Sequence, residues 1–413
     1  GGHMLNFEYQ NPTKVLFGKG QIAKISHEIP SDARILIVYG GGSIIANGTM
    51  DLAKRALAGR NITEFGGIEP NPDYETLMQA VAVVKKERIN FLLAIGGGSV
   101  IDGTKFIAAA ACWELGDPWE ILHNKGKGIR NVIPFGCILT LPATGSEMNQ
   151  HAVISRKNRQ ISLPSASGSQ GNSGALSMHS QIAKEKLAFS NDQVFPQFAV
   201  LDPVTTFSLP KLQIANGIVD AFCHVIEQYL TYPVNANLQD RFAESIMLTL
   251  LDDGIKSYQQ PDDYDSRANL MWCATMALNG LIGSGVPQDW SSHAIGHELT
   301  ALFGLAHAET LAIVLPGTMA VRKEEKKDKL IQYAKRVWGI QGKNEDLVIQ
   351  QAIDKTIAFF ESLGFATHLS AYNIKEEQIP DIAATLLKHG MTGIGEHGTV
   401  TLDICEEILR KAL

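Results

Sequence analysis

Histidines at helical spacing and one aspartate lie in two apolar segments in the second half of this 413-residue chain. Asp220 and His224 are four residues apart in GIVDAFCHVIEQ. His293 and His297 are four residues apart in HAIGHELTALFGLAH, which ends at His307. Residues at this spacing share one face of an α-helix. A carboxylate and several imidazoles on apolar helices are typical of a divalent metal site, because both groups are good ligands for such ions.

An alternative is that these histidines are ordinary core residues bonded to backbone groups. Burying the carboxylate of Asp220 without a cation would be costly, so the groups taken together favour a metal. The zinc-protease motif H-E-x-x-H is absent, because in the His293/His297 pair the glutamate, Glu298, follows the second histidine instead of the first. The nearby thiol, Cys223, is expected on a different helical face. The spacing leaves open which histidines are ligands, and HAIGHELTALFGLAH is expected to form a buried helix.

Two glycine triplets, each followed by serine, favour a nucleotide site. They occupy residues 40–43 and 96–99, between an apolar strand-like run and a helical pattern. Glycine lets the backbone approach a phosphate closely, and a helix N-terminus offers free N–H groups. Two such loops on one parallel sheet converge at its carboxyl edge. Either loop could simply be a tight turn, and neither matches G-x-G-x-x-G.

The first loop also bears on the choice of coenzyme. An acidic residue at the end of the run ILIVYG (35–40) would hold the ribose hydroxyls of NAD and repel the 2′-phosphate of NADP. The residues that follow it, Gly40 to Ser43, offer only small groups and one hydroxyl. This favours NADP over NAD.

The elements that must position these residues differ between the two halves. In the first half, strand-like runs alternate with helical patterns, which predicts a doubly wound parallel sheet. The expected strands are 35–40, 62–67, 91–97 and parts of 132–144, 152–155 and 198–203, and the expected helices are 44–59, 71–90 and 99–113. After Pro203 the patterns are long, amphipathic and helical.

We therefore expect an α/β dinucleotide-binding domain with a Rossmann-like parallel sheet over residues 5–207. An all-α metal-binding domain should follow over residues 208–413. A Ser/Gly-rich stretch at about 158–183 is expected to be a surface loop without chemistry of its own. Residues 1–4 are interpreted as an expression scar, and no leader peptide is expected.

Composition limits the class of protein. The net charge of −7 disfavours binding to nucleic acid or to an anionic membrane. No apolar run is long enough for a transmembrane helix. The five cysteines are scattered without a C-x-x-C pair, which indicates a reducing compartment, and we expect the cytoplasm.

Four motifs together resemble the iron-containing alcohol dehydrogenase family. They are GGGSVIDGTK (96–105), LPATGSEMN (141–149), NGIVDAFCHVIEQ (216–228) and HAIGHELTALFGLAH (293–307). The resemblance runs from residue 11 almost to the end. EFGGIEPNPDYETLM and GLIGSGVPQDWSSHAIGHELTA resemble its branch of NADPH-dependent butanol dehydrogenases and broad-range aldehyde reductases. The resemblance implies a dehydroquinate-synthase-like architecture, with metal and substrate in a cleft between the two domains.

The resemblance also implies roles for individual residues. The metal ligands would be Asp220, His224, His293 and His307, and His297 would be a catalytic residue facing the nicotinamide and the substrate. The implied cofactor-binding residues are Gly41, Gly42, Ser43, Gly97, Gly98, Ser99, Asp102, Thr140, Thr144, Asn149 and Lys186. The chain departs from the branch at residues 157–185, where the link before Lys186 is longer than usual. This insertion could cap the cleft, contact another subunit or be tolerated passively.

The expected reaction is the reduction of short- to medium-chain aldehydes to primary alcohols. NADPH would deliver hydride while a divalent ion, Zn²⁺ or Fe²⁺, polarises the carbonyl. A NAD-dependent polyol dehydrogenase, a dehydroquinate-synthase-like lyase and a non-catalytic nucleotide- or metal-binding protein are the alternatives. The expected partner is a small aldehyde or alcohol, and the family suggests a homodimer.

Overall fold

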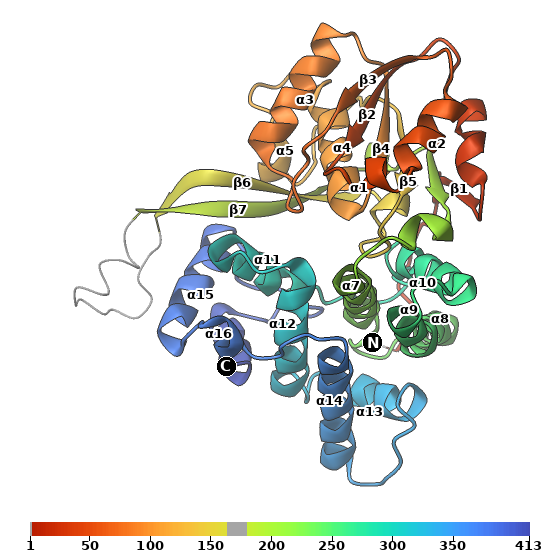
Figure 1. Ribbon diagram of the computed structural model, residues 1–413. Helices are drawn as coiled ribbons and strands as arrows, with labels where there is room; N and C mark the ends of the chain where they lie inside the picture. The colour runs from red at the N-terminus through yellow and green to blue at the C-terminus, as the bar shows by residue number, and fades with distance from the viewer. Residues whose placement is uncertain (1, 163–179) are drawn as a thin grey trace.

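A six-stranded parallel sheet forms the centre of the N-terminal half in the computed structural model, which describes residues 2–162 and 180–413 (Figure 1). The strand order is β1-β8-β5-β4-β2-β3. The strands are β1 (Lys14–Phe17), β2 (Arg34–Tyr39), β3 (Asn61–Phe65), β4 (Phe91–Gly96), β5 (Phe135–Leu139) and β8 (Phe198–Leu201). Every residue of β4, β5 and β8 is buried, as expected for parallel strands covered on both faces. The predicted parallel sheet is thus confirmed.

The α-helices of the N-terminal half accompany this sheet. They are α1 (Ser43–Ala46), α2 (Thr49–Ala56), α3 (Tyr74–Lys86), α4 (Gly98–Ala110) and α5 (Glu120–His123). The single helix expected over 44–59 is wrong, because Gly48 adopts a left-handed φ of 85° and separates α1 from α2. The helix expected from residue 71 begins at Tyr74, because the side chain of Asp73 caps it by accepting from the backbone N–H of Glu75.

A two-stranded antiparallel ribbon leaves the sheet and passes beside the helical half (Figure 1). It consists of β6 (His151–Ser162) and β7 (Ser180–Ser190). The flanks of the stretch expected to be a loop, 158–162 and 180–183, are therefore strand. Cross-strand pairing, which continues from Arg159 opposite Ala183 to Ser162 opposite Ser180, outweighs the loop-like composition. Residues 163–179 of the predicted loop lie outside the described residues.

From residue 208 to the C-terminus, all of which is described, the chain is helical and contains no strand. Its helices are α7 (Lys211–Tyr229), α8 (Asn237–Thr249), α9 (Ile255–Gln259), α10 (Tyr264–Ala277), α11 (Ser291–Phe303), α12 (His307–Val321), α13 (Lys327–Arg336), α14 (Glu345–Ser362), α15 (Ile379–Lys388) and α16 (Leu402–Lys411). A π-helical turn, Leu250–Gly254, joins α8 to α9. No described helix is both long and apolar enough to cross a membrane.

Short 3-10 turns complete the chain, at Gln21–His27, Ser146–Met148, Asp192–Val194, Pro203–Thr206, Leu369–Tyr372 and Glu376–Gln378. One further expectation fails in the helical half. HAIGHELTALFGLAH is two helices rather than one, because Gly304 ends α11 in a left-handed conformation with φ 72°. His307 is consequently the first residue of α12. The chain reverses between these helices, which pack against each other.

Candidate metal and nucleotide site

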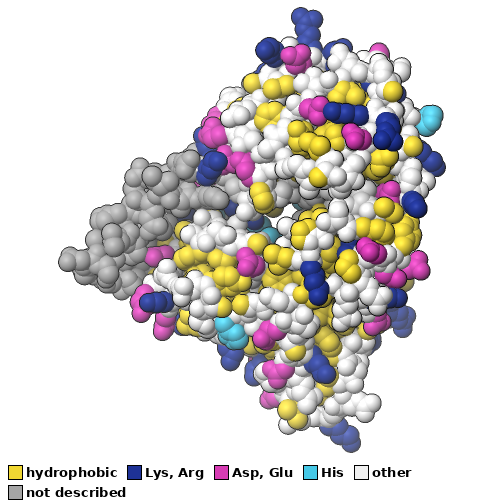
Figure 2. All heavy atoms as spheres, in the orientation of Figure 1, with side chains coloured by type: hydrophobic (Ala, Val, Ile, Leu, Met, Phe, Trp, Pro, Cys, Tyr) yellow, Lys and Arg dark blue, Asp and Glu magenta, His cyan; other side chains and the backbone are white. Residues whose placement is uncertain are grey.

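A cavity of about 1200 Å³ separates the carboxyl edge of the sheet from the helical half. Its walls come from the N-terminal end of α4, the ribbon strands β6 and β7, and the helices α7, α11 and α12. Figure 2 shows this face of the molecule hollowed between the two halves. We call this cavity the cleft. It lies where ligands bind in open parallel α/β sheets.

Four of the predicted residues meet in the cleft. Asp220 and His224 come from consecutive turns of α7, His293 from α11 and His307 from the start of α12. One ligand atom of each lies within 4.8 Å of the others. The rings of His224 and His293 are stacked, with centroids 4.9 Å apart. We call these four residues the metal cluster.

The chemistry of the metal cluster fits a divalent cation. Asp220 Oδ1 lies 2.9 Å from His307 Nε2 and 3.5 Å from His224 Nε2. It nevertheless has no hydrogen-bond partner among the described residues, and neither does the buried His293 Nε2. Buried polar atoms without partners are rare, since each costs free energy. A cation bound by all four side chains would satisfy these atoms together.

The protonation states also suit a metal. Burial lowers the pKa of His224 to about 3 and that of His293 to about 4, while the nearby Asp220 carboxylate only partly opposes this effect. Burial lowers the pKa of His307 well below its ordinary value as well. The imidazoles are therefore neutral near neutral pH, which is the form that binds metals. Burial raises the pKa of Asp220, and the neighbouring histidines partly offset this rise.

A buried carboxylate outside the metal cluster orients one of its members. Glu227 Oε2 lies 3.2 Å from His293 Nδ1 and accepts a hydrogen bond from the His293 backbone N–H at 3.2 Å. With Nδ1 held by Glu227, the His293 Nε2 atom faces the metal cluster. Behind Glu227, the buried Lys326 ammonium lies 2.8 Å from Asp289 Oδ2 and 2.6 Å from Glu396 Oε2.

His297 lies in the cleft but outside the metal cluster. It follows His293 by one turn of α11, and its ring is 5.8 Å from that of His307. Four residues of an α-helix span about 6 Å along its axis, so His297 lies away from the four converging ligand atoms. The reversal at Gly304 brings His307 there instead. Burial, and after it the charge of Lys186, lowers the pKa of His297 well below the ordinary value.

Six predicted cofactor residues line the cleft, namely Gly98, Ser99, Asp102, Thr144, Asn149 and Lys186. Gly98 begins α4, and a Cβ there would lie 2.2 Å from the Thr144 hydroxyl oxygen. Only glycine therefore fits at this end of α4. The Asp102 carboxylate accepts hydrogen bonds from the Ser146 hydroxyl at 2.6 Å and the Val153 N–H at 2.9 Å.

The amide of Asn149 already has four partners. Its Oδ1 accepts from Lys105 Nζ at 2.9 Å and from the His151 N–H at 3.0 Å. Its Nδ2 donates to the carbonyl oxygens of Gly145 at 2.9 Å and Leu278 at 3.1 Å. Asn149 therefore joins the loop after β5 to the helical half, and this accounts for its burial without a ligand.

The remaining predicted cofactor residues do not line the cleft. These are Gly41, Gly42, Ser43, Gly97 and Thr140. No atom approaches within 4 Å of a Cβ placed at Gly41 or Gly42, so this loop is open. The helix that follows it, α1, has only four residues instead of the long helix expected there. Their roles stay predictions.

Trp290, Glu298 and His389 are among the cleft residues that were not predicted from the sequence. Trp290, at a left-handed φ of 65°, precedes α11 with its ring 5.1 Å from that of His293. Its indole N–H donates to Gln288 Oε1 at 2.7 Å. None of the three has a local sequence signal, whereas Glu227, behind the cleft, continues the face of α7 that carries Asp220 and His224.

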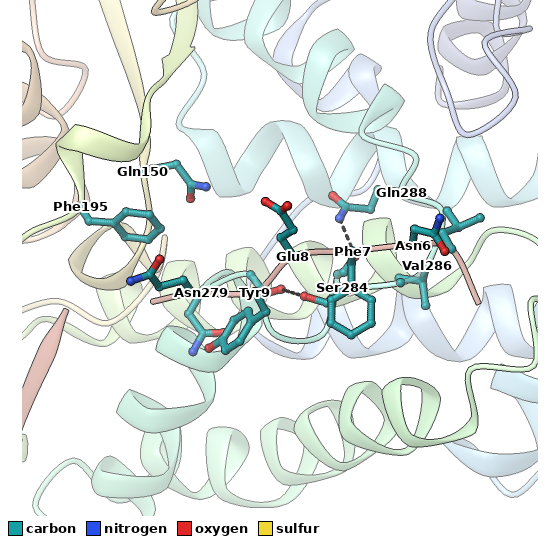
Figure 3. A pocket seen from close by; sticks show the side chains of 15 residues that line it. Asn6, Phe7, Glu8, Tyr9, Gln150, Phe195, Asn279, Ser284, Val286 and Gln288 are labelled. Carbon is teal, nitrogen blue, oxygen red and sulfur yellow. Dashed lines mark hydrogen bonds between the residues drawn. The ribbon is translucent and has the colours of Figure 1, made fainter. Parts of the chain in front are cut away.

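A second hollow, of about 390 Å³, lies beside the cleft (Figure 3). The N-terminal segment, residues 5–10, covers it over the loop before α11. Leu5 N–H donates to the Gly285 carbonyl at 2.9 Å, and Asn11 Nδ2 donates to the Met148 carbonyl at 2.8 Å. Gln150 and Gln288 line both the hollow and the cleft, so the hollow adjoins the cleft.

Known proteins share this sequence and structure. The family model described as iron-containing alcohol dehydrogenase matches residues 12–167, and the model of the C-terminal part of the Fe-containing alcohol dehydrogenase family matches residues 214–413. The chain is 53% identical over 410 residues to the NADPH-dependent aldehyde reductase YqhD of Escherichia coli, which covers 99% of this chain and 100% of that protein.

Two further similarities extend over nearly the full length. The probable NADH-dependent butanol dehydrogenase 1 of Bacillus subtilis is 38% identical over 395 residues, covering 94% of this chain and 95% of that protein. A crystal structure of Escherichia coli YqhD matches with a TM-score of 0.92 and 52% identity over all of both chains. The fold, the cleft and the sequence therefore point to the same family.

Proposed function

Because the chain belongs to the iron-containing alcohol dehydrogenase family, we propose that it is a metal- and NADP(H)-dependent aldehyde reductase. It reduces short- to medium-chain aldehydes to primary alcohols. The observation that carries this proposal is the convergence of Asp220, His224, His293 and His307 in a cleft whose opposite wall carries the glycine loop of α4. Such a cleft suits hydride transfer beside a metal.

When bound, a divalent ion held by the metal cluster supplies a Lewis acid, and NADPH supplies the hydride. The protein's own residues orient the metal ligands and transfer protons. Glu227 fixes the orientation of His293, and the Trp290 ring covers the metal cluster from one side. The neutral imidazole of His297 has one N–H and one acceptor nitrogen, so it can relay a proton within the cleft.

The coenzyme assignment rests on charge. β2 ends at Tyr39, and the four residues after it carry no carboxylate that would repel a 2′-phosphate. The similar proteins include both an NADPH-dependent and an NADH-dependent enzyme. We propose NADPH on the basis of the missing carboxylate, the YqhD similarity and Lys186 in the cleft. One aspartate and three histidines suit Zn²⁺ or Fe²⁺, and we propose one ion of either kind.

The test is to follow the absorbance of the reduced nicotinamide while the purified, metal-analysed protein reduces butanal. NADPH should support a higher kcat/KM than NADH, and chelation should abolish turnover. Full activity after the metal is removed would overturn the proposal. Oxidation of glycerol with NAD⁺ at a higher kcat/KM would favour a polyol dehydrogenase instead.

Assembly and location complete the proposal. From the family we infer a homodimer, which light scattering of the purified protein tests. All five cysteines are free, and four are buried. Unpaired thiols are typical of reducing compartments, so we propose the cytoplasm. Fractionation of the producing cell tests this.

A further inference from the structure

A buried histidine between two buried carboxylates joins the ribbon to the helical half. His389, directly after α15, has its Nδ1 2.7 Å from Glu298 Oε1 of α11. Its Nε2 lies 3.7 Å from Glu185 Oε2 of β7. These three side chains are at most 8% exposed, and all line the cleft. We call them the ribbon clamp. None belongs to the metal cluster.

Charge explains why the three residues stay together. Carboxylates out of water are costly unless a cation pairs with them. Burial alone would lower the pKa of His389, but the contacts with Glu185 and Glu298 outweigh it and raise the pKa to about 9. The imidazole is therefore a cation near neutral pH, and it attracts a carboxylate from each side.

The next residue of β7 points the other way. Successive side chains of a strand face opposite sides, so the side chain of Lys186 is on the other face of β7 from that of Glu185. Lys186 Nζ donates to Asn71 Oδ1 at 3.1 Å, across the cleft from the metal cluster. Burial raises the pKa of Asp102 on α4, and the charge of Lys186 partly offsets this rise. Burial lowers the pKa of His297 on α11, and the charge of Lys186 lowers it further. Lys186 thus lies between the N-terminal end of α4 and the metal cluster.

From this arrangement we propose that the ribbon clamp is a positioning device, which holds β7 so that the Lys186 ammonium can bind a phosphate of NADP(H). The inference rests on the proposed function, since it assumes that the dinucleotide enters the cleft. Glu298 is also the neighbour of His297 and lies on the helix that carries His293. The ribbon clamp therefore fixes the lysine relative to the metal cluster, and its role is one of positioning.

The first measurement is the Kd for NADPH of the full-length, metal-loaded protein with Glu185→Gln, obtained by fluorescence titration. This change keeps the side-chain volume and removes the charge. We expect the Kd to rise about tenfold, because displacing the Lys186 ammonium weakens a charge-assisted contact with the phosphate. The kcat at saturating NADPH should stay within about twofold, since the metal cluster is intact. An unchanged Kd would overturn the proposal.

Asp240→Asn is the matched control. It removes one partner of another ion pair, with Lys329 Nζ at 2.7 Å, inside the helical half and outside the cleft. It should lower the melting temperature without changing the Kd for NADPH. If this control raised the Kd as much as Glu185→Gln does, general loss of stability would explain the effect and the proposal would fall. His389→Gln tests the same clamp if Glu185→Gln does not fold.

A double-mutant cycle separates positioning from a merely structural role. If the ribbon clamp acts through Lys186, Glu185→Gln should add nothing to the loss caused by Lys186→Met. Independent, additive losses would contradict the proposal, and so would a Lys186→Met protein with unchanged NADPH affinity. A wild-type protein that binds no NADPH would overturn the proposed function, and this inference with it.

Discussion

At the scale of single residues, the metal cluster depends on a carboxylate that is not one of its members. Glu227 contacts both the Nδ1 atom and the backbone N–H of His293 through one oxygen, and its side chain is only 1% exposed. Such a partner fixes both the ring orientation and the nitrogen that remains for the metal. The helix α7 therefore supplies two members of the metal cluster and the support for a third.

Replacing this partner should weaken metal binding without removing a ligand. We expect Glu227→Gln to lower metal affinity by about ten- to a hundredfold. Competition with a chromophoric chelator measures the change. The control is Glu244→Gln, another buried carboxylate of the helical half, which bonds to the Tyr229 hydroxyl at 2.6 Å. Equal metal affinity in Glu227→Gln and wild type would show that His293 is held by packing alone.

An experiment on His297 should distinguish its role from that of the metal ligands. His297→Ala should keep its bound metal but lose about a hundredfold in kcat, as expected when a proton relay is removed. Because the pKa of His297 lies well below the ordinary value of 6.5, the wild-type profile should show no inflection from this residue near neutral pH. Metal analysis and a pH series of kcat test both points. Loss of the metal in His297→Ala would make it a ligand after all.

At the scale of elements, the charge of His389 links the ribbon strand β7 to the helices α11 and α15, and this charge depends on pH. The pKa of His389 is raised from 6.5 to about 9 in the folded protein. A raised pKa means that the stabilisation is complete below the unfolded value and is lost as the pH rises through the folded value. The facing groups are Glu298 on α11 and Glu185 on β7.

The contact of His389 should therefore stabilise the fold at neutral pH more than at alkaline pH. We expect His389→Gln to lower the melting temperature clearly at about pH 7 and much less at about pH 10, where wild-type His389 is neutral as well. Thermal unfolding of both proteins across this range, in one ionic strength, measures the difference. If the difference in melting temperature between wild type and His389→Gln instead increased with pH, a stabilising imidazolium at His389 would be contradicted.

At the scale of the whole molecule, metal binding should be linked to stability, because the metal cluster unites α7, α11 and α12. A ligand that binds only the folded state adds about 2.7 kcal/mol at a hundred times its Kd. Removing the metal should lower the melting temperature, and adding Zn²⁺ or Fe²⁺ should restore it. Asp220→Asn should lose this response. A melting temperature indifferent to metal in the wild type would contradict a site formed by folding.

Local sequence patterns were enough to predict the parallel sheet, the helical second half and the kinds of side chain in the metal cluster. Apolar runs of strand length and helical periodicity express backbone geometry, which acts over a few residues. The resemblance of the motifs then implied which four residues converge. It could not show the ribbon, where cross-strand pairing prevails over a loop-like composition from Arg159 to Ser162.

How residues distant in the sequence come into contact depends on the packing of the whole chain. Spacing alone paired His293 with His297, whereas the chain reversal at Gly304 placed His307 beside Asp220 and left His297 one turn away. The contact of Glu227 with His293, and that of Glu185 with His389, join elements that are far apart along the chain. Such contacts follow from how whole helices and strands pack, and no local pattern encodes the packing of partners so distant in sequence.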